Sequence, residues 1–345
     1  MQELDLFANT SIPFPPPSVP AFTFIDLFAG IGGFRLALQS LGGVCVFSSE
    51  WHLPAANTYA MNFGDFPHGD ITLQETKAAV PVGFDVLTGG FPCQPFSISG
   101  KMKGFEDTRG TLIYDVFEIV NKHQPKVVLL ENVKHLKHHD SGRTLQVIEE
   151  GLQNLGYHVS WQILNASDFG VPQNRERIII VATHKRAFDF STIPKETERP
   201  RLKDFLDSNT EVFDYLNEPY TLLAQTTIQK SGLIFCGYRN KGIRKVGIRP
   251  GTEHLSRVHK QPNRIYSTEG IHPALSSQET SGRFFIYDQG KVRKLTMSEC
   301  FRIMGFPEEY IRIGAVSEQY RQIGNSVCVP MIKAVCTEII KQGFI

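Results

Sequence analysis

The sequence has no run of about 18 consecutive apolar residues, no cysteine pair at zinc-ligand spacing, and almost no net charge. The 345 residues carry a formal charge of +1, so any surface that binds a polyanion must be local. The missing apolar run argues against a membrane span. The six cysteines form no Cys-x-x-Cys pair, which favours free thiols in a reducing compartment. We therefore expect a cytoplasmic protein with no bound metal and no membrane partner.

The N-terminal 20 residues lack the basic start and apolar core of a secretory signal. They contain five prolines, which favours a flexible arm over residues 1–20. The length of the chain predicts two domains. Apolar periodicity weakens from Phe188 to about residue 290, and turn residues become frequent there. This change marks the expected second domain.

A strand, a glycine-rich turn and a helix follow one another near the start of the chain. Residues 22–28 are apolar and aromatic, residues 29–33 contain three glycines, and residues 34–41 place apolar residues at helical spacing. This order opens a nucleotide-binding α/β unit. A plain tight turn is the alternative for a glycine-rich segment alone.

The second predicted strand, 44–49, ends on Glu50, which can accept hydrogen bonds from both ribose hydroxyls. The dinucleotide fingerprint is incomplete, because no glycine lies three residues after Gly32. The pattern therefore favours a nucleoside ligand without a pyrophosphate. Asp70, ahead of the next helix, has two open interpretations: a helix N-cap or an acceptor for an exocyclic amine such as that of adenine.

Cys93 follows a predicted buried strand, 84–88, and prolines lie immediately before it and two residues after it. Each proline fixes φ and removes a backbone donor, so a stiff loop presents the thiol at a strand end. An isolated cysteine is more often a buried apolar residue, but this bracketing favours a nucleophile. The polar run that follows, 97–110, is typical of a loop over a site.

Three further charged residues follow or precede buried strands. The apolar strand 125–130 runs into Glu131, where desolvation would raise the pKa and allow the carboxyl to hold and deliver a proton. Arg175 and Arg177 alternate along an extended segment before strand 178–182, so we expect both guanidiniums on one face, gripping carbonyl or phosphate oxygens. Solvated strand-end charges are the alternative for all three.

The expected second domain has a basic centre. Residues 228–264 contain nine lysines and arginines against one acid, interrupted by glycines and aromatic residues. A solvated basic face is the usual explanation, but this composition also suits loops pressed onto a phosphate backbone. The arginines predicted to contact DNA there are Arg239, Arg244, Arg249 and Arg257.

Seven motifs, in order along the chain, resemble those of the DNA cytosine-5 methyltransferases, and in particular the bacterial enzymes of type II restriction–modification systems. They are Phe28-Ala29-Gly30-Ile31-Gly32-Gly33, Glu50-Trp51, Gly69-Asp70, Phe91-Pro92-Cys93-Gln94, Glu131-Asn132-Val133, Gln173-Asn174-Arg175-Glu176-Arg177 and Gly324-Asn325-Ser326-Val327. The resemblance covers roughly residues 22–185 and 290–335.

The resemblance implies a doubly wound, Rossmann-like catalytic domain that binds S-adenosyl-L-methionine, built from residues 21–195 and 315–345. Residues 196–314 would form a smaller, irregular target-recognition domain and hinge. The implied enzyme transfers a methyl group to C5 of a flipped-out cytosine in double-stranded DNA. It would act as a bacterial, cytoplasmic monomer, and its genetic partner would be a cognate restriction endonuclease.

The resemblance also assigns roles to residues. Cys93 would add to C6 of the cytosine, and Glu131 would donate a proton or hydrogen bond at N3. Arg177 would hold the O2 carbonyl, and Arg175 would support the site. Ser97 and Ser99 would lie in the loop that closes over the DNA. The implied cofactor residues are Phe28, Gly30, Gly32, Glu50, Trp51, Asp70, Ile71 and Asn325.

One departure from the family pattern is Ala274, which stands where a Thr-Leu pair would place threonine, so one phosphate or backbone contact is in doubt. The transfer-RNA cytosine methyltransferases share the catalytic motifs, but the long basic segment favours duplex DNA. A catalytically inactive DNA-binding regulator would not need Cys93, Glu131 and Arg177 together. A Rossmann oxidoreductase would not explain the missing fingerprint or the basic segment.

Overall fold

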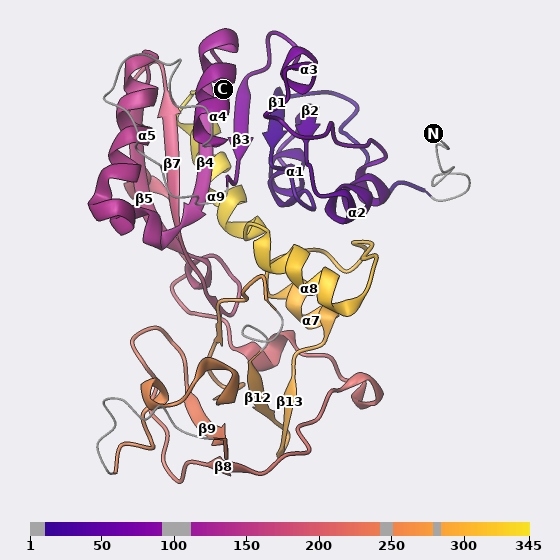
Figure 1. The fold of residues 1–345 in the computed structure, drawn as a ribbon, viewed down its shortest axis with the longest axis vertical. Helices are drawn as coiled ribbons and strands as arrows, with labels where there is room; N and C mark the ends of the chain where they lie inside the picture. Colours follow the sequence, from indigo (N-terminus) through magenta and orange to yellow (C-terminus); the bar gives the residue numbers. More distant parts are fainter. Residues whose placement is uncertain (1–10, 92–111, 242–250, 279–283) are drawn as a thin grey trace. The chain divides into compact units, whose positions relative to one another are not determined.

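The computed structural model describes residues 11–91, 112–241, 251–278 and 284–345 (Figure 1). Its contacts divide the chain into two compact units. Unit 1 contains Met1–Leu164, Glu176–Pro194 and Met331–Ile345, and unit 2 contains Asn165–Arg175 and Lys195–Pro330. Residues 165–175 and 315–330 thus group with unit 2, whereas the sequence suggested the catalytic domain for both. The functional roles of the two units stay a prediction.

Unit 1 is built on a six-stranded sheet in the order β2-β1-β3-β4-β7-β5. β1 pairs in parallel with β2 and β3, and β3 with β4, while β7 runs antiparallel to β4. The strands are β1 (Phe22–Leu27), β2 (Gly43–Ser49), β3 (Val86–Gly89), β4 (Val127–Val133), β5 (His158–Asn165) and β7 (Glu176–Thr183). Every strand predicted for this part of the sequence is present, and the α/β expectation is confirmed.

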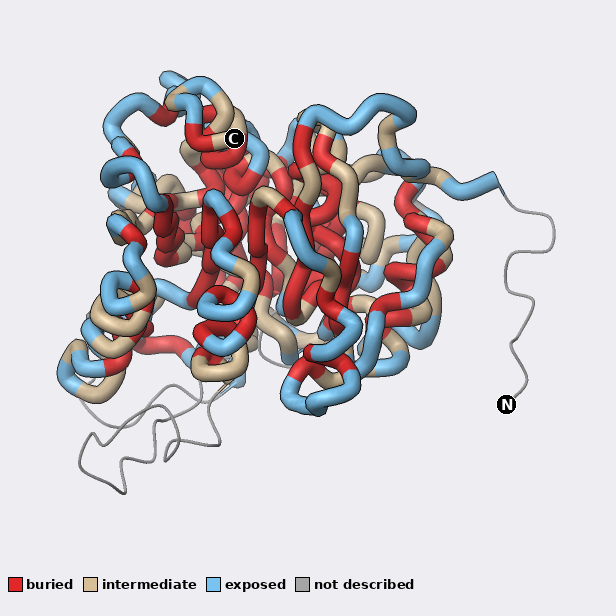
Figure 2. Tube along the Cα trace, turned by 90° about the horizontal axis from the view of Figure 1, so that it is seen from above, coloured by how far each residue is buried: buried red, intermediate tan, exposed pale blue. Residues whose placement is uncertain are grey.

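Both faces of this sheet are buried, which is why its strands read as nearly continuous apolar runs. On one face, alternate residues such as Leu87, Leu130 and Ile180 form a core cluster with apolar residues of α4 and α5. On the other face, the intervening residues such as Leu129 and Val181 are also fully buried. Figure 2 shows buried residues in red, with exposed residues around them.

The helices of unit 1 follow the predicted pattern at most positions. They are α1 (Gly33–Gln39), α2 (Leu53–Phe63), α3 (Gln74–Ala78), α4 (Leu112–His123), α5 (Arg143–Asn154) and α9 (Val329–Lys341), with the 3-10 helices η1 (Lys134–Gly142) and η3 (Phe190–Thr192). The sequence predicts helices at 34–41, after Asp70, and at 111–122, 145–155 and 329–340, so α2 is the α-helix of this list that was not expected. It carries a proline in its first turn and ends at Gly64, whose φ is 78°, both of which are typical helix signals.

Unit 2 contains a five-stranded sheet in the order β13-β12-β10-β9-β8. Its strands are β8 (Tyr220–Leu222), β9 (Phe235–Arg239), β10 (Arg264–Ser267), β12 (Phe285–Asp288) and β13 (Lys291–Lys294). A separate pair joins β6 (Gln173–Asn174) to β11 (His272–Pro273). The strands of the five-stranded sheet are three to five residues long, too short for a clear period of two, so the sequence suggested an irregular domain.

The helices of unit 2 are α7 (Met297–Arg302) and α8 (Val316–Asn325), with η2 (Ala166–Asp168), η4 (Leu202–Phe205), η5 (Thr210–Val212), η6 (Ser256–Val258) and η7 (Gln261–Asn263). α7 starts with a capping box in which the Thr296 side chain and the Glu299 side chain each bind the other's main-chain N–H. α8 was not predicted, and it ends at Asn325. The last helix predicted from the sequence, residues 329–340, is present as α9.

The described part of the N-terminal arm is bound to unit 1. The main-chain N–H of Phe14 donates to the Asn62 carbonyl at 3.0 Å, and the Gln39 amide donates to the carbonyls of Phe14 and Pro15. The Ile12 side chain contacts the position at which a Cβ on Gly64 would lie. Residues 12–15 of the predicted arm therefore contact unit 1.

Among the described residues, one segment, Val316–Lys341, reaches the length and hydropathy of a membrane span, and 61% of its apolar window is buried. The segment is not one continuous helix. α8 ends where Ser326 adopts an extended conformation, and α9 begins at Val329. A mostly buried, broken segment of this kind is typical of a protein core.

Candidate active site

Three residues of the turn after β1 adopt the left-handed conformation that favours glycine, and two of them are glycines. Phe28, Gly30 and Gly32 have φ values of 55°, 54° and 80°. A Cβ on Gly32 would lie 2.3 Å from the Phe63 ring, whereas a Cβ on Gly30 would have no atom within 4 Å. Gly32 is therefore needed for packing, and Gly30 leaves the main chain open to a ligand. Phe28 is a non-glycine residue in the left-handed region, a feature that concentrates at functional sites.

The Glu50 carboxylate binds this turn directly. One oxygen accepts from the Gly30 N–H at 2.8 Å, and the other accepts from the His52 N–H at 2.7 Å. Burial raises the pKa of Glu50, and these two backbone bonds oppose that effect. Each carboxylate oxygen has a second lone pair, so the group can still accept a ligand hydroxyl while it holds the turn.

The other predicted cofactor residues of unit 1 differ in exposure. The Trp51 side chain is 70% exposed and adjoins Glu50, while Ile71 is 3% exposed and belongs to the core. One oxygen of Asp70 accepts from the Thr72 N–H at 2.9 Å. This is a turn bond ahead of α3, and Asp70 is not the helix N-cap, because the residue at that position is Leu73. An open glycine turn, a carboxylate and an exposed indole together fit the sugar and the flat base of a nucleoside.

Asp26, the next-to-last residue of β1, was missed by the sequence analysis. Its carboxyl is fully buried, and one oxygen accepts from the Thr88 hydroxyl at 2.9 Å. Its other oxygen has no hydrogen-bond partner among the described residues. Burial raises the pKa of Asp26 to about 7. The sequence signal that could have identified Asp26 is the presence of an acid in an otherwise largely apolar strand.

The parallel strands bring the functional segments to one edge of the sheet. The carboxyl ends of β1, β2, β3 and β4 all lie at this edge, because these strands pair in parallel. The strand order reverses between β1 and β3, and open α/β sheets bind ligands at such a switch point. The turn with Glu50 lies on one side of this point and Glu131 on the other.

Glu131 and Arg177 form an ion pair at this edge. Register places Glu131 opposite Ile179 and Val133 opposite Arg177 on the antiparallel strand β7, so the two side chains are diagonal neighbours on one face. The Arg177 Nε lies 2.9 Å from the Glu131 Oε1, and the side chains are only 13% and 11% exposed. The sequence analysis considered only desolvation of the Glu131 carboxyl. The structure adds the Arg177 guanidinium as its ion-pair partner.

Asn132, the next residue of β4, binds the segment that precedes the predicted nucleophile. Its side-chain amide donates to the Phe91 carbonyl at 2.7 Å, within the core of unit 1. Phe91 is the last described residue before the loop. Cys93, Ser97 and Ser99 lie outside the described residues, so their predicted roles stay predictions.

Arg175 and Arg177 have different partners, although the sequence predicted both guanidiniums on one face. Arg175 is 1% exposed. It donates to the carbonyls of Leu275, Gly324 and Ser326, all in unit 2. Arg177 pairs with Glu131 in unit 1. The predicted cofactor residue Asn325 is exposed and lies between two of the carbonyls that Arg175 binds.

The arginines predicted to contact DNA also differ. The Arg239 guanidinium is paired with Glu218 and lies over the Phe285 ring. Arg257, in η6, is exposed. Arg244 and Arg249 lie outside the described residues. Arg257 is thus the more accessible cation of the two that the structure describes.

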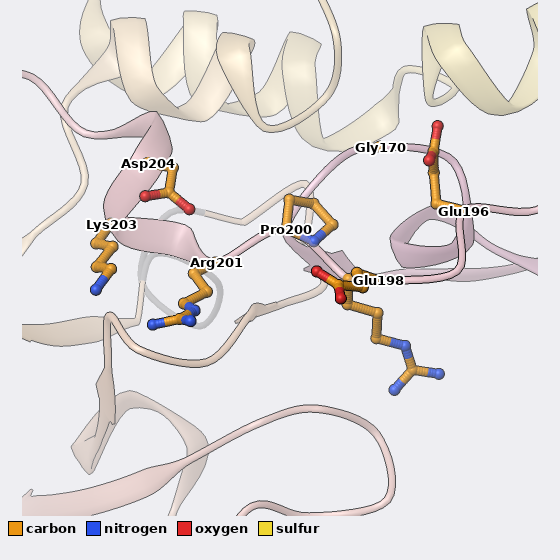
Figure 3. Close-up of a pocket in the computed structure, with 8 residues that line it drawn as sticks. Gly170, Glu196, Glu198, Pro200, Arg201, Lys203 and Asp204 are labelled. Atoms are coloured by element: carbon orange, nitrogen blue, oxygen red, sulfur yellow. The ribbon is translucent and has the colours of Figure 1, made fainter.

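A pocket of unit 2 contains none of the predicted site residues (Figure 3). Its lining carries acids and bases together, and Arg201 and Lys203 project to the same side (Figure 3). Both cations pair with Glu269, at 3.1 and 2.9 Å. No group of His, Cys, Asp or Glu side chains that could hold a metal ion occurs within the described ranges.

Comparison with known proteins agrees with this arrangement. The C-5 cytosine-specific DNA methylase family matches residues 22–341. The chain is 44% identical to the type II methyltransferase M.HpaII of Haemophilus parainfluenzae, over 95% of this chain and 93% of that protein. It is 42% identical to M.HhaI of Haemophilus parahaemolyticus, over 92% and 93%.

Solved structures share the fold at lower identity. A DNMT2 from Spodoptera frugiperda aligns with a TM-score of 0.66 at 18% identity, covering 93% of this chain and 100% of that one. A putative DNA modification methyltransferase from an Escherichia coli prophage gives 0.63 at 22%, covering 93% and 99%. Together with the family match, these findings show that the chain belongs to the C-5 cytosine-specific DNA methylases and is a DNA cytosine-5-methyltransferase of the type II group.

Proposed function

We propose that the protein transfers a methyl group from S-adenosylmethionine to C5 of a cytosine flipped out of double-stranded DNA. The observation that carries this proposal is the Glu131–Arg177 pair at the carboxyl end of β4. Asn132, beside it, binds the carbonyl of Phe91, which lies two residues before Cys93 in the sequence. An acid and a guanidinium thus lie beside the strand end that leads toward the predicted nucleophile in the sequence.

This set of groups suits addition to a pyrimidine ring. C5 of cytosine is a poor nucleophile until the Cys93 thiolate forms a bond to C6. Glu131 delivers a proton or hydrogen bond at N3, so that the addition builds no unstabilised anion, and Arg177 holds the O2 carbonyl. After methylation the C5 proton leaves and the bond from sulfur to C6 breaks. A base inside a duplex cannot reach these groups, so it must be flipped out.

The other side of the switch point suits the cofactor. S-adenosylmethionine supplies an electrophilic methyl group. Glu50 would accept from the ribose, Phe28 and Trp51 would pack against the adenine, and Asp70 would accept from its amine. Gly30 would allow close approach, and Gly32, Ile71 and Asn325 would complete the site.

The biological role follows from the type II relatives. Methylation of a specific site by a cytoplasmic monomer would protect host DNA from a cognate restriction endonuclease. Residues 196–314 would read the site and residues 21–195 with 315–345 would perform the reaction.

Cys93→Ser tests the mechanism. We expect the variant to bind S-adenosylmethionine but to transfer no methyl group, because a hydroxyl is far less ionised than a thiol. A duplex with 5-fluorocytosine at the target should trap a denaturation-resistant adduct with the natural enzyme, since fluorine cannot leave as a cation. Appreciable turnover by the variant, or no adduct with the natural enzyme, would contradict the proposal.

Mapping of the product tests the substrate. Plasmid treated with the enzyme should carry 5-methylcytosine at one short recognition sequence and nowhere else. Transfer RNA should remain unmodified under the same conditions. Methylation of transfer RNA without methylation of duplex DNA would overturn the assignment of the substrate.

A further inference from the structure

The buried Arg175 side chain joins two distant segments of unit 2. Its Nη1 donates to the Leu275 carbonyl at 2.8 Å. Its Nη2 donates to the Gly324 carbonyl at 2.9 Å and to the Ser326 carbonyl at 2.7 Å. One guanidinium therefore fixes the main chain on both sides of Asn325.

The position of these carbonyls explains why a guanidinium is suited to them. α8 ends at Asn325, and the last carbonyls of a helix have no intrahelical partner. A cation at this end also complements the negative end of the helix dipole. Arg175 thus caps the C-terminus of α8 with a rigid, planar fork of donors, which a lysine cannot reproduce.

The two segments that Arg175 joins are in close main-chain contact. A Cβ on Gly324 would lie 2.1 Å from the Ser276 carbonyl oxygen, so only glycine fits. Gln173, two residues before Arg175, accepts from the Leu275 N–H at 3.0 Å and donates to the Ile303 carbonyl at 2.9 Å. Alternate side chains of one short segment therefore hold three separate pieces of unit 2.

We propose that Arg175 is a positioning residue that holds the main chain of Gly324–Ser326, and through it the exposed Asn325 side chain, in the conformation that receives the cofactor. The cofactor role of Asn325 is part of the proposed function. Arg175 itself is 1% exposed, and its Nη1 and Nη2 groups donate to main-chain carbonyls, so we assign it a positioning role and no contact with the cofactor or the target base.

Arg175→Lys keeps the charge but cannot span three carbonyls. We expect S-adenosylmethionine to bind about tenfold more weakly by calorimetry, because hydrogen bonds from a charged donor are lost beside the site. The KM for the cofactor should rise, whereas kcat at saturating cofactor and the KM for DNA should change less than about twofold. Amide hydrogen exchange over 324–328 should become faster.

Gly324→Ala disturbs the same segment while leaving Arg175 in place, and it should reproduce the weaker cofactor binding. Arg264→Lys is the matched control, because Arg264 also donates to a main-chain carbonyl of unit 2, that of His259. This control should bind the cofactor normally.

A different pattern would overturn the proposal. If Arg175→Lys lowers kcat with cofactor binding and exchange over 324–328 unchanged, Arg175 acts on the substrate and not on this segment. Asn325→Ala separates the two hypotheses: unchanged cofactor affinity in that variant would remove Asn325 from the cofactor site. The exchange data would still decide whether Arg175 holds the segment.

Discussion

Arg177 lies diagonally across from Glu131 on the neighbouring antiparallel strand, with its Nε 2.9 Å from the Glu131 Oε1. Each side chain limits the rotamers of the other, so the pair presents an acceptor and a donor set in a fixed relation. This pre-organisation is what an active site requires of groups that must meet one base. The Glu131 carboxyl is also nearly buried. Substitution of either residue therefore leaves the charge of the other without its partner in a site that water reaches poorly.

Glu131→Gln keeps the shape of the side chain but removes its proton chemistry and its ion pair. We expect the single-turnover methylation rate to fall by roughly 10²- to 10⁴-fold, the usual contribution of a general acid or base. Cofactor affinity should change little. Glu176→Gln is the control, because Glu176 pairs with the exposed Lys134. A rate for Glu131→Gln within about threefold of the natural enzyme would place the proton donor elsewhere.

Asp26→Asn should make stability less dependent on pH. Burial raises the folded pKa of Asp26 to about 7 from an ordinary value of 3.8. Between these values the unfolded chain loses the proton and the folded protein keeps it, so the natural protein loses stability as pH rises through this window. The Asp26→Asn variant has no such loss. Its free energy of unfolding, relative to that of the natural protein, should therefore rise by about 1.4 kcal/mol per pH unit up to about pH 7.

Urea unfolding at pH 5, 6, 7 and 8 measures this difference. Asp85→Asn is the control. Burial raises the pKa of Asp85, but the bonds from Lys126 and Thr23 outweigh burial and lower it overall, so its contribution is constant across this range. A pH-independent difference between Asp26→Asn and the natural protein would show that Asp26 is ionised in the fold.

Arg293 should be essential for the stability of unit 2. It binds Glu299 through two bonds of 2.9 Å and Asp288 through one of 2.9 Å, and Glu299 is fully buried. Arg293→Met leaves both carboxylates buried without their cation, so the free energy of unfolding should fall by about 3–5 kcal/mol. Lys294→Met removes a more exposed pair with Asp214 and should cost at most about 1 kcal/mol. Equal effects in denaturant titrations would show that the network is not a buried charge cluster.

Arg239 and Arg257, the two predicted DNA contacts that the structure describes, should behave differently in DNA binding. Arg257→Ala should weaken binding to all sequences and reduce the salt slope by about one unit, as loss of a phosphate contact does. Arg239→Ala should leave the slope unchanged, because Glu218 already neutralises that guanidinium. Dissociation constants for target and unrelated duplexes at several salt concentrations would measure both. Equal slopes for both variants would contradict this assignment.

Long apolar strands and the strand-end residues could be predicted, because a parallel sheet buries its strands on both faces and exposes their carboxyl ends. Arg175 shows the limit: its alternation with Arg177 suggested a shared face, but partners far away in the sequence, such as Gly324 for Arg175 and Glu131 for Arg177, decide which atoms each one binds. Asp26 was missed because its environment comes from Thr88 on another strand. The short strands of unit 2 have too few residues for a period to be visible.

Exchange of residues 196–314 with those of a relative of different specificity tests the division of labour. We expect the chimera to methylate the site of the donor, because the basic segment lies within the exchanged region. Bisulfite sequencing of plasmid DNA identifies the site. A folded, active chimera that keeps the original site would show that recognition lies elsewhere in the chain.

The segment Asn165–Arg175 limits which relatives can donate residues 196–314. It belongs to unit 2 but is encoded between two strands of the unit 1 sheet, so a contiguous swap leaves β6 and Arg175 with the recipient. The incoming segment must then offer β6 a strand like β11 and offer Arg175 a carbonyl like that of Leu275. Recombination between genes can therefore transfer a new specificity as one continuous piece of DNA only among lineages that preserve this junction.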